Sequence, residues 1–110
     1  MGDHYLLDLF GCNPRKLDDE GFIRGVMEQA IWKGNLTLLN MVFHKFEPQG
    51  ITAIFLLSES HISIHTWPEN GTAAVDVYTC GEKADPMLVC EYIKTELNAS
   101  SADIKNIKRG

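Results

Sequence analysis

The chain has 110 residues, of which 45% are hydrophobic and 23% charged, and its formal net charge is -5. This length gives room for one domain, and the ordinary apolar content argues against intrinsic disorder and against a fibrous repeat. The ten basic residues are scattered along the chain instead of forming a patch, so we expect no nucleic-acid partner.

The sequence contains no apolar run close to the roughly 20 residues that a membrane span requires. The first residues also lack a basic segment followed by an apolar stretch. We therefore expect a cytoplasmic protein with no membrane partner. Three cysteines, Cys12, Cys80 and Cys90, form no CxxC pair, so the sequence indicates neither a disulfide framework nor a thiolate zinc site.

The first part of the chain predicts a strand and a helix. Residues 4–10 alternate as a strand does, and Gly11 with Asn13-Pro14 signals a turn after it. Asp18 or Asp19 is expected to cap a helix that ends at Gly34. The helix is predicted by apolar positions at i, i+4 spacing, namely Phe22, Ile23, Val26, Met27, Ala30 and Ile31.

The middle of the chain predicts an antiparallel meander, because four alternating segments follow one another with turn residues between them. These segments are residues 39–44, 51–57, 61–65 and 73–79. Pro86 then begins a second helix, with Val89, Ile93 and Leu97 on one stripe, and residues 102–107 predict a last strand. The predicted fold is α+β, a two-layer sandwich with a mainly antiparallel sheet and two helices on one face.

Reactive side chains are concentrated in residues 57–69, where hydroxyl residues, two histidines and two carboxylates follow one another. A purely structural hairpin has little need for this composition. Residues 59–69 read ESHISIHTWPE and residues 73–81 read AAVDVYTCG. With these two motifs in this order, the chain resembles the prokaryotic S-adenosylmethionine decarboxylases.

The resemblance extends over most of the single domain, residues 1–110. It includes Gly2-Asp3-His4, beside a family G-R-H, and the segment HKFEPQG at residues 44–50. Asp3 departs from the usual arginine. Thr52 stands where the family usually has serine, but it retains a hydroxyl.

The resemblance implies an inactive proenzyme that cuts its own Glu59–Ser60 bond, leaving a β chain of residues 1–59 and an α chain of residues 60–110. The Ser60 hydroxyl attacks the Glu59 carbonyl, and loss of the Ser60 α-proton then eliminates the resulting ester. Hydrolysis releases ammonia and leaves a covalent pyruvoyl group, which is the implied cofactor. His65 is the implied proton acceptor, a role that suits a neutral histidine, and Thr52 a possible hydrogen-bond donor.

The implied activity is decarboxylation of S-adenosylmethionine, which yields the aminopropyl donor for spermidine synthesis. The pyruvoyl ketone forms a Schiff base with the substrate amine and accepts the electrons released with carbon dioxide. Cys80 is the implied proton donor to the α-carbon, because a thiol can serve as an acid at neutral pH. Asp76 shares the strand face of Cys80, but the sequence does not indicate its partner.

The resemblance also suggests how the nucleoside is held. The adenine stacks between the rings of Phe46 and His65, and the Glu69 carboxylate accepts hydrogen bonds from the ribose hydroxyls. Similar pyruvoyl enzymes that act on arginine or ornithine bind no nucleoside. Retention of Phe46 and of residues 67–69 therefore favours S-adenosylmethionine over those alternative substrates.

Two other interpretations of the sequence assign the chain to a different class of protein, one as a non-catalytic regulator and one as a metal-binding protein. The chain could be a non-catalytic homologue that regulates an active partner, but such a protein would have no need of Ser60, His65 and Cys80. His61 and His65, with another histidine, could be read as metal ligands. No cysteine or carboxylate falls at a supporting spacing, so we expect no metal site.

Strand alternation raises one question about the implied site, since it places Ser60 and His65 on opposite faces of the strand. Their cooperation needs either a bend at the Glu59–Ser60 bond or a contribution from another protomer. Helices on one sheet face leave the other face to be covered, which favours self-association. The resemblance likewise implies a homodimer of cleaved pairs with sites near the interface.

Overall fold

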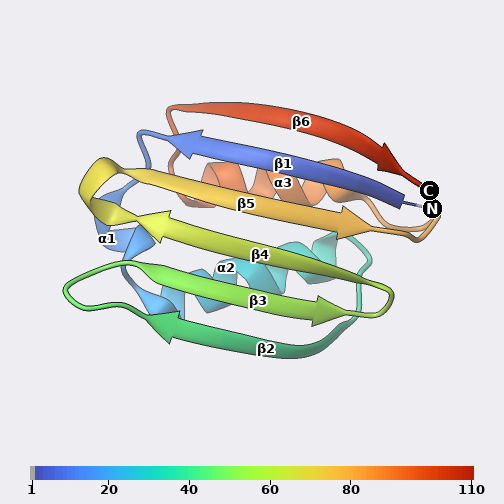
Figure 1. Cartoon of the computed structure of the whole chain (residues 1–110), viewed down its shortest axis with the longest axis horizontal. Coiled ribbons are helices and arrows are strands. Elements are labelled where there is room, and N and C mark those ends of the chain that lie inside the picture. The colour runs from blue at the N-terminus through green and yellow to red at the C-terminus, as the bar shows by residue number, and fades with distance from the viewer. Residues whose placement is uncertain (1) are drawn as a thin grey trace.

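Six alternating segments form one antiparallel sheet in the computed structural model, which describes residues 2–110. The strands lie side by side in the order β2-β3-β4-β5-β1-β6 (Figure 1). They are β1 (Gly2–Phe10), β2 (Leu38–Lys45), β3 (Ile51–Leu57), β4 (Ser60–Trp67), β5 (Thr72–Thr79) and β6 (Ser101–Arg109). The predicted meander is β2 to β5.

The first strand does not lie at an edge of the sheet. One side of β1 pairs with β5, from Asp3 opposite Thr79 to Leu9 opposite Ala73. Its other side pairs with β6 over its whole length. The N-terminal strand is therefore inserted between two strands from the second half of the chain, and both chain ends lie at the same end of the sheet (Figure 1).

Two helices cover one face of the sheet, α2 (Glu20–Lys33) and α3 (Pro86–Glu96) (Figure 1). The Asp19 carboxylate caps α2 by accepting from the backbone N–H of Phe22 at 3.0 Å, and Asp85 caps α3 in the same way. Gly34 is the C-cap of α2, as the sequence predicted. The predicted α+β sandwich with helices on one face is confirmed.

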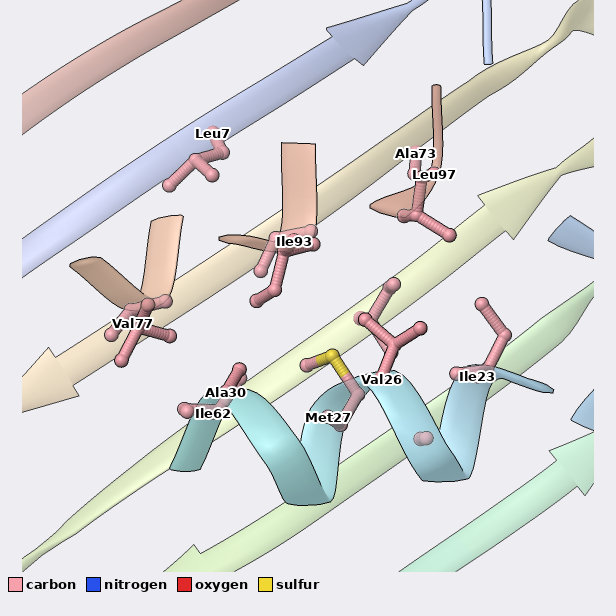
Figure 2. Close-up of a cluster of buried hydrophobic side chains, with 14 of the residues drawn as sticks. Leu7, Ile23, Val26, Met27, Ala30, Ile62, Ala73, Val77, Ile93 and Leu97 are labelled. Atoms are coloured by element: carbon pink, nitrogen blue, oxygen red, sulfur yellow. The ribbon is translucent and has the colours of Figure 1, made fainter. Parts of the chain in front are cut away.

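The core lies between the helices and this face of the sheet. Apolar side chains from α2 and α3 point onto the strands, where they meet the inward residues of β1, β4 and β5 (Figure 2). The labelled members include Leu7, Ile23, Met27, Ile62, Val77 and Ile93, each at most 1% exposed. Burial of two apolar faces against each other supplies the main stabilisation of such a domain.

The structure adds two short helices to the prediction. The Asn13-Pro14 turn opens a one-turn helix, α1 (Pro14–Leu17), because the Asn13 side chain caps the N–H groups of Arg15 and Lys16. A 3-10 turn, η1 (Pro68–Asn70), connects β4 to β5. No helix among residues 2–110 combines the length and the apolar character of a membrane span.

Within residues 2–110, the other face of the sheet carries no helix (Figure 1). Along its β2–β3 side it presents apolar side chains to solvent, including Val42, Ile54 and Leu56, which are 66%, 50% and 51% exposed. We call this the open face of the sheet. Large apolar side chains exposed together mark an interaction surface more often than a solvated one.

Candidate active site

The Glu59–Ser60 bond lies at a strained hairpin turn. Ser58 and Glu59 connect β3 to β4, whose last pair is Leu57 opposite Ser60. Glu59 has φ +63°, a left-handed conformation that costs a residue with a side chain roughly 1–2 kcal/mol. The Ser60 side chain is nearly buried, and its hydroxyl donates to the Ser58 carbonyl at 3.3 Å. The hydroxyl is therefore held against the turn that contains the predicted scissile bond.

Cys80 lies at the same end of the sheet, directly after β5. The β4–β5 register pairs His61 with Tyr78, so Ser60 and Thr79 are the next pair of neighbours. A hollow of about 310 Å³ opens here. Its lining includes Gly2, Asp3, Thr79, Cys80, Lys108 and Arg109. We call it the thiol pocket.

The three cysteines differ sharply in environment. Cys12 and Cys90 are buried, while Cys80 is partly exposed. Burial raises the pKa of the Cys12 thiol. Burial, aided by the charge of Glu91, raises the pKa of Cys90 to about 12. Cys80 is therefore the one of these three thiols with access to a ligand.

A second group of predicted residues meets at the opposite end of β4. Thr52 and His65 are directly opposed on β3 and β4, and the Thr52 hydroxyl lies 3.0 Å from Nδ1 of His65. Beside them is a hollow of about 340 Å³ whose lining includes Phe46, His65, Trp67 and Glu69. Its lining contains all three residues of the predicted adenosine clamp, and we call it the nucleoside pocket after that prediction.

Asp18 holds the loop that forms one wall of the nucleoside pocket. Its carboxylate accepts from the Gly50 N–H at 2.9 Å and pairs with the Lys45 ammonium at 2.9 Å. The Gly50 hydrogen bond, followed by the Lys45 hydrogen bond, lowers the pKa of Asp18. The sequence suggested Asp18 or Asp19 as a helix cap. Asp19 takes that role, and Asp18 instead fixes residues 45–50.

The two groups do not meet within one chain. Strand β4 runs without interruption from Ser60 to Trp67, and Ser60 and His65 alternate onto opposite faces. Five residues of strand separate them by roughly 16 Å. The turn at Glu59 does not bring them together.

A polar cluster lies between the two groups on the open face. Asp76 accepts from Nε2 of His4 at 3.2 Å and from the Ser63 hydroxyl at 3.2 Å, which identifies the partners that the sequence left open. The rings of His4 and His61 are 6.4 Å apart. Within residues 2–110 no three His, Cys, Asp or Glu side chains are arranged to hold a metal ion.

Tyr78 lies at the same end of the sheet as Cys80, and the sequence analysis did not include it among the site residues. The Cys80 side chain is the largest cause that raises the pKa of Tyr78, whereas the Arg109 charge lowers it. The available signal was strand parity, which puts Tyr78 and Cys80 on one side of β5.

Known proteins resemble the chain over its whole length. The S-adenosylmethionine decarboxylase family model matches residues 3–110. A relative from Prochlorococcus marinus (strain MIT 9313), named S-adenosylmethionine decarboxylase proenzyme, is 49% identical over 99% of this chain and 87% of its own length. A relative of the same name from Pyrococcus abyssi is 44% identical over 100% of this chain and 79% of its own.

A solved structure agrees with the fold as well. The crystal structure of the adenosylmethionine decarboxylase from Aquifex aeolicus superimposes with a TM-score of 0.93 at 43% identity, and covers 100% of this chain and 91% of that one. The α+β sandwich and its two motifs thus define a domain of the decarboxylase class. The chain belongs to the S-adenosylmethionine decarboxylase family.

Proposed function

We propose that the protein decarboxylates S-adenosylmethionine with a pyruvoyl group that it makes from Ser60 by cutting its own Glu59–Ser60 bond. The observation that carries this proposal is the position of Ser60, directly after the left-handed Glu59 and at the same end of the sheet as Cys80. The relatives are named as proenzymes, which agrees with a chain that is made before it is cut.

The surroundings of Ser60 fit a pyruvoyl group. Ser60 supplies the carbon skeleton, and the thiol pocket, which Cys80 lines at the same end of the sheet, has room for the amino-acid part of a substrate. When formed, the group supplies an electron-accepting carbonyl next to the substrate amine. Cys80, which is partly exposed there, delivers a proton to the substrate α-carbon.

The nucleoside pocket supports the choice of substrate. Phe46 and His65 supply two aromatic walls for adenine, and Glu69 supplies an acceptor for ribose hydroxyls. Arginine and ornithine would leave this pocket empty. The product would serve as an aminopropyl donor in spermidine synthesis, and the cytoplasmic location remains a prediction.

A second copy of the chain would complete the site. In the proposed dimer, two sheets pack through their open faces about a two-fold axis near Ser63, which is midway along β4. This axis places the Ser60 end of one sheet over the His65 end of the other. Each copy then provides the turn at the Glu59–Ser60 bond and Cys80 to one site, and Thr52, His65 and the nucleoside pocket to the other. The exposed apolar residues Val42, Ile54 and Leu56 provide contact area for such a homodimer.

Intact mass measurement tests the chemistry. The purified protein is weighed before and after borohydride trapping with S-adenosylmethionine, arginine and ornithine in separate samples. We expect two fragments divided at Ser60, with a nucleoside-containing adduct on residues 60–110. An adduct with arginine or ornithine alone would preserve self-cleavage but change the substrate. A chain that stays whole on prolonged incubation would exclude the enzyme and favour the regulatory homologue.

Mixing two inactive variants tests the composite site. Ser60→Ala and His65→Ala chains are each expected to stay uncut, but a mixed dimer retains one site with Ser60 from one copy and His65 from the other. We expect the His65→Ala chain alone to be cut after mixing. If mixing restores no cleavage although mixed dimers form, the site is not shared between copies.

A further inference from the structure

We infer that His44 is a positioning residue for the nucleoside pocket, and that its imidazole holds the Phe46 ring in the orientation in which this ring forms a wall for adenine. This inference rests on the proposed function, in which Phe46 and His65 stack on the adenine. It gives a task to a histidine that lies outside the lining of the pocket and that the predicted site did not include.

The backbone of Phe46 is held at the end of β2. Its N–H donates to the Gly50 carbonyl at 2.8 Å, which closes the loop of residues 47–49. The preceding residue, Lys45, pairs with Ile51 on β3. The starting point of the Phe46 side chain is therefore fixed, but these contacts do not set the direction of its ring.

The orientation of the Phe46 ring depends on packing, because the ring has no polar atom and the residue is 46% exposed. An exposed side chain changes rotamer within picoseconds to nanoseconds unless a neighbour restrains it. Among residues 2–110, the aromatic ring in contact with Phe46 is that of His44. The two ring centroids are 4.5 Å apart and the ring planes meet at 67°, an edge-to-face arrangement that aromatic pairs favour. The His44 ring therefore restrains the Phe46 ring.

Strand β2 places His44 for this contact. His44 and Phe46 are two residues apart, so strand alternation directs both side chains to the open face of the sheet. Thr52 lies directly opposite His44 on β3, and His65 lies opposite Thr52 on β4. The three residues form a cross-strand row at the end of the sheet that carries the nucleoside pocket. His65 supplies one wall of the predicted clamp from this row, and His44 supports the other wall.

The two walls gain their order in different ways. The His65 ring is restrained by a hydrogen bond, since its Nδ1 lies 3.0 Å from the Thr52 hydroxyl. A phenyl ring can form no such bond, and the edge contact with His44 takes its place. A ring that is ordered before binding lowers the entropy cost of ordering the site around the nucleoside. Removal of the His44 ring should therefore weaken nucleoside binding without changing the chemistry at the Glu59–Ser60 bond.

Nucleoside binding to an uncut chain gives the first test. The Ser60→Ala chain and its His44→Ala derivative are titrated by isothermal calorimetry with 5′-methylthioadenosine, which has the nucleoside of the proposed substrate but no amino-acid part. We expect His44→Ala to raise Kd by about two- to tenfold, the range of one aromatic pair. His44→Phe restores a ring at this position and should keep Kd close to that of the Ser60→Ala reference.

Trp32→Ala is the matched control, because it removes another exposed aromatic ring, 73% exposed, from α2 on the helical side. It should leave Kd unchanged. His44 is itself exposed, so His44→Ala should keep the urea unfolding midpoint of the reference chain. An unchanged Kd in His44→Ala would overturn the inference, as would equal weakening by His44→Ala and His44→Phe.

Steady-state kinetics of the cleavable chain give the second measurement. We expect His44→Ala to raise KM and to leave kcat and the rate of self-cleavage close to wild type, the pattern of lost binding that the transition state shares with the substrate. Slower self-cleavage with unchanged nucleoside binding would assign His44 to the Thr52–His65 pair instead, and the inference would be wrong.

The same measurements separate the inference from the proposed function. If the Ser60→Ala chain binds 5′-methylthioadenosine and His44→Ala does not alter Kd, the proposed substrate survives and the role of His44 is wrong. If the Ser60→Ala chain binds no nucleoside and borohydride trapping gives an adduct with arginine or ornithine alone, the proposed substrate fails and the inference fails with it.

Discussion

Glu59 holds a left-handed conformation immediately before the bond that is proposed to break. Glycine adopts this conformation without the steric cost but loses more chain entropy on folding. We therefore expect Glu59→Gly, made in a Ser60→Ala background to keep the chain whole, to raise the free energy of unfolding by about 0.5–1 kcal/mol.

Urea unfolding measures this change. Glu82→Gly is the matched control, because Glu82 lies in a loop and outside the left-handed region. It should be neutral or destabilising. Equal destabilisation by both substitutions would show that the Glu59 conformation stores no strain.

The Thr52 hydroxyl is 3.0 Å from the His65 ring and is proposed to help His65 during self-cleavage. Thr52→Val keeps the shape of the side chain but removes the hydrogen bond. We expect self-cleavage to slow by about tenfold, which corresponds to roughly 1.4 kcal/mol. The time course is followed by denaturing gel or intact mass. Thr52→Ser retains the hydroxyl and should cleave at close to the wild-type rate, so equal slowing in both variants would contradict this role.

At the scale of residues, the sequence could predict the candidate site residues that stand within a short continuous motif. Ser60, His65, Glu69 and Cys80 stand inside two short motifs, and the structure places the last three in or beside pockets. The contact of the Tyr78 ring with Gly2 could not be predicted, because Gly2 is 76 positions away and is brought close only by the β1–β5 pairing. No local pattern contains that register.

At the scale of elements, Asp18 connects the end of α1 to the loop after β2. Its carboxylate is 35% exposed, which weakens its ion pair through solvent screening. We expect Asp18→Asn to lower the free energy of unfolding at pH 7 by about 1 kcal/mol, mainly through weaker hydrogen bonding. It should also raise KM, because the loop carries Phe46. The matched control Asp103→Asn alters a more exposed carboxylate, 57% exposed, and should change neither quantity.

The pH dependence of this effect has a defined sign. Contacts with Gly50 and Lys45 lower the pKa of Asp18 in the folded protein. The stabilisation is therefore complete above the pKa of an unfolded aspartate, about 3.9, and is lost as the pH falls through the lower folded value. Unfolding experiments should show the wild type and Asp18→Asn converging in acid. A constant difference down to pH 2 would contradict the assignment.

The two long helices were predictable because each has a strong local signal. An apolar stripe with i, i+4 spacing defines α2 between Asp19 and Gly34, and Pro86 marks the start of α3. Helix α1 was read as a turn, because four residues are too few to show a helical period. The last strand is longer than predicted since pairing with β1, and not its own composition, sets its length.

At the scale of the whole molecule, the open face of the sheet is expected to be the dimer interface. Ile54 lies on this face and is 50% exposed, while Leu88 is 42% exposed on α3, on the helical side. We expect Ile54→Lys to shift the protein toward monomer and to reduce self-cleavage at least tenfold, because burial of an uncompensated charge opposes association.

Sedimentation velocity reports the assembly and intact mass the cleavage. Leu88→Lys makes the same chemical change on the opposite side and should leave both unchanged. A monomeric Ile54→Lys protein that still cuts itself at the normal rate would mean that one chain contains a complete processing site.

The insertion of β1 between β5 and β6 affects how the protein can refold. If the proposed cleavage occurs, we expect residues 1–59 and 60–110 to stay joined through the β3–β4, β5–β1 and β1–β6 ladders, so that the cut protein keeps its shape. Once denatured, however, the pieces share no covalent bond and must find each other by diffusion, which makes refolding dependent on concentration. The uncut chain folds as a single covalent molecule, so its refolding does not depend on concentration in this way. We therefore expect the fold to form before the proposed cut, after which a denatured protein can no longer refold as a single chain.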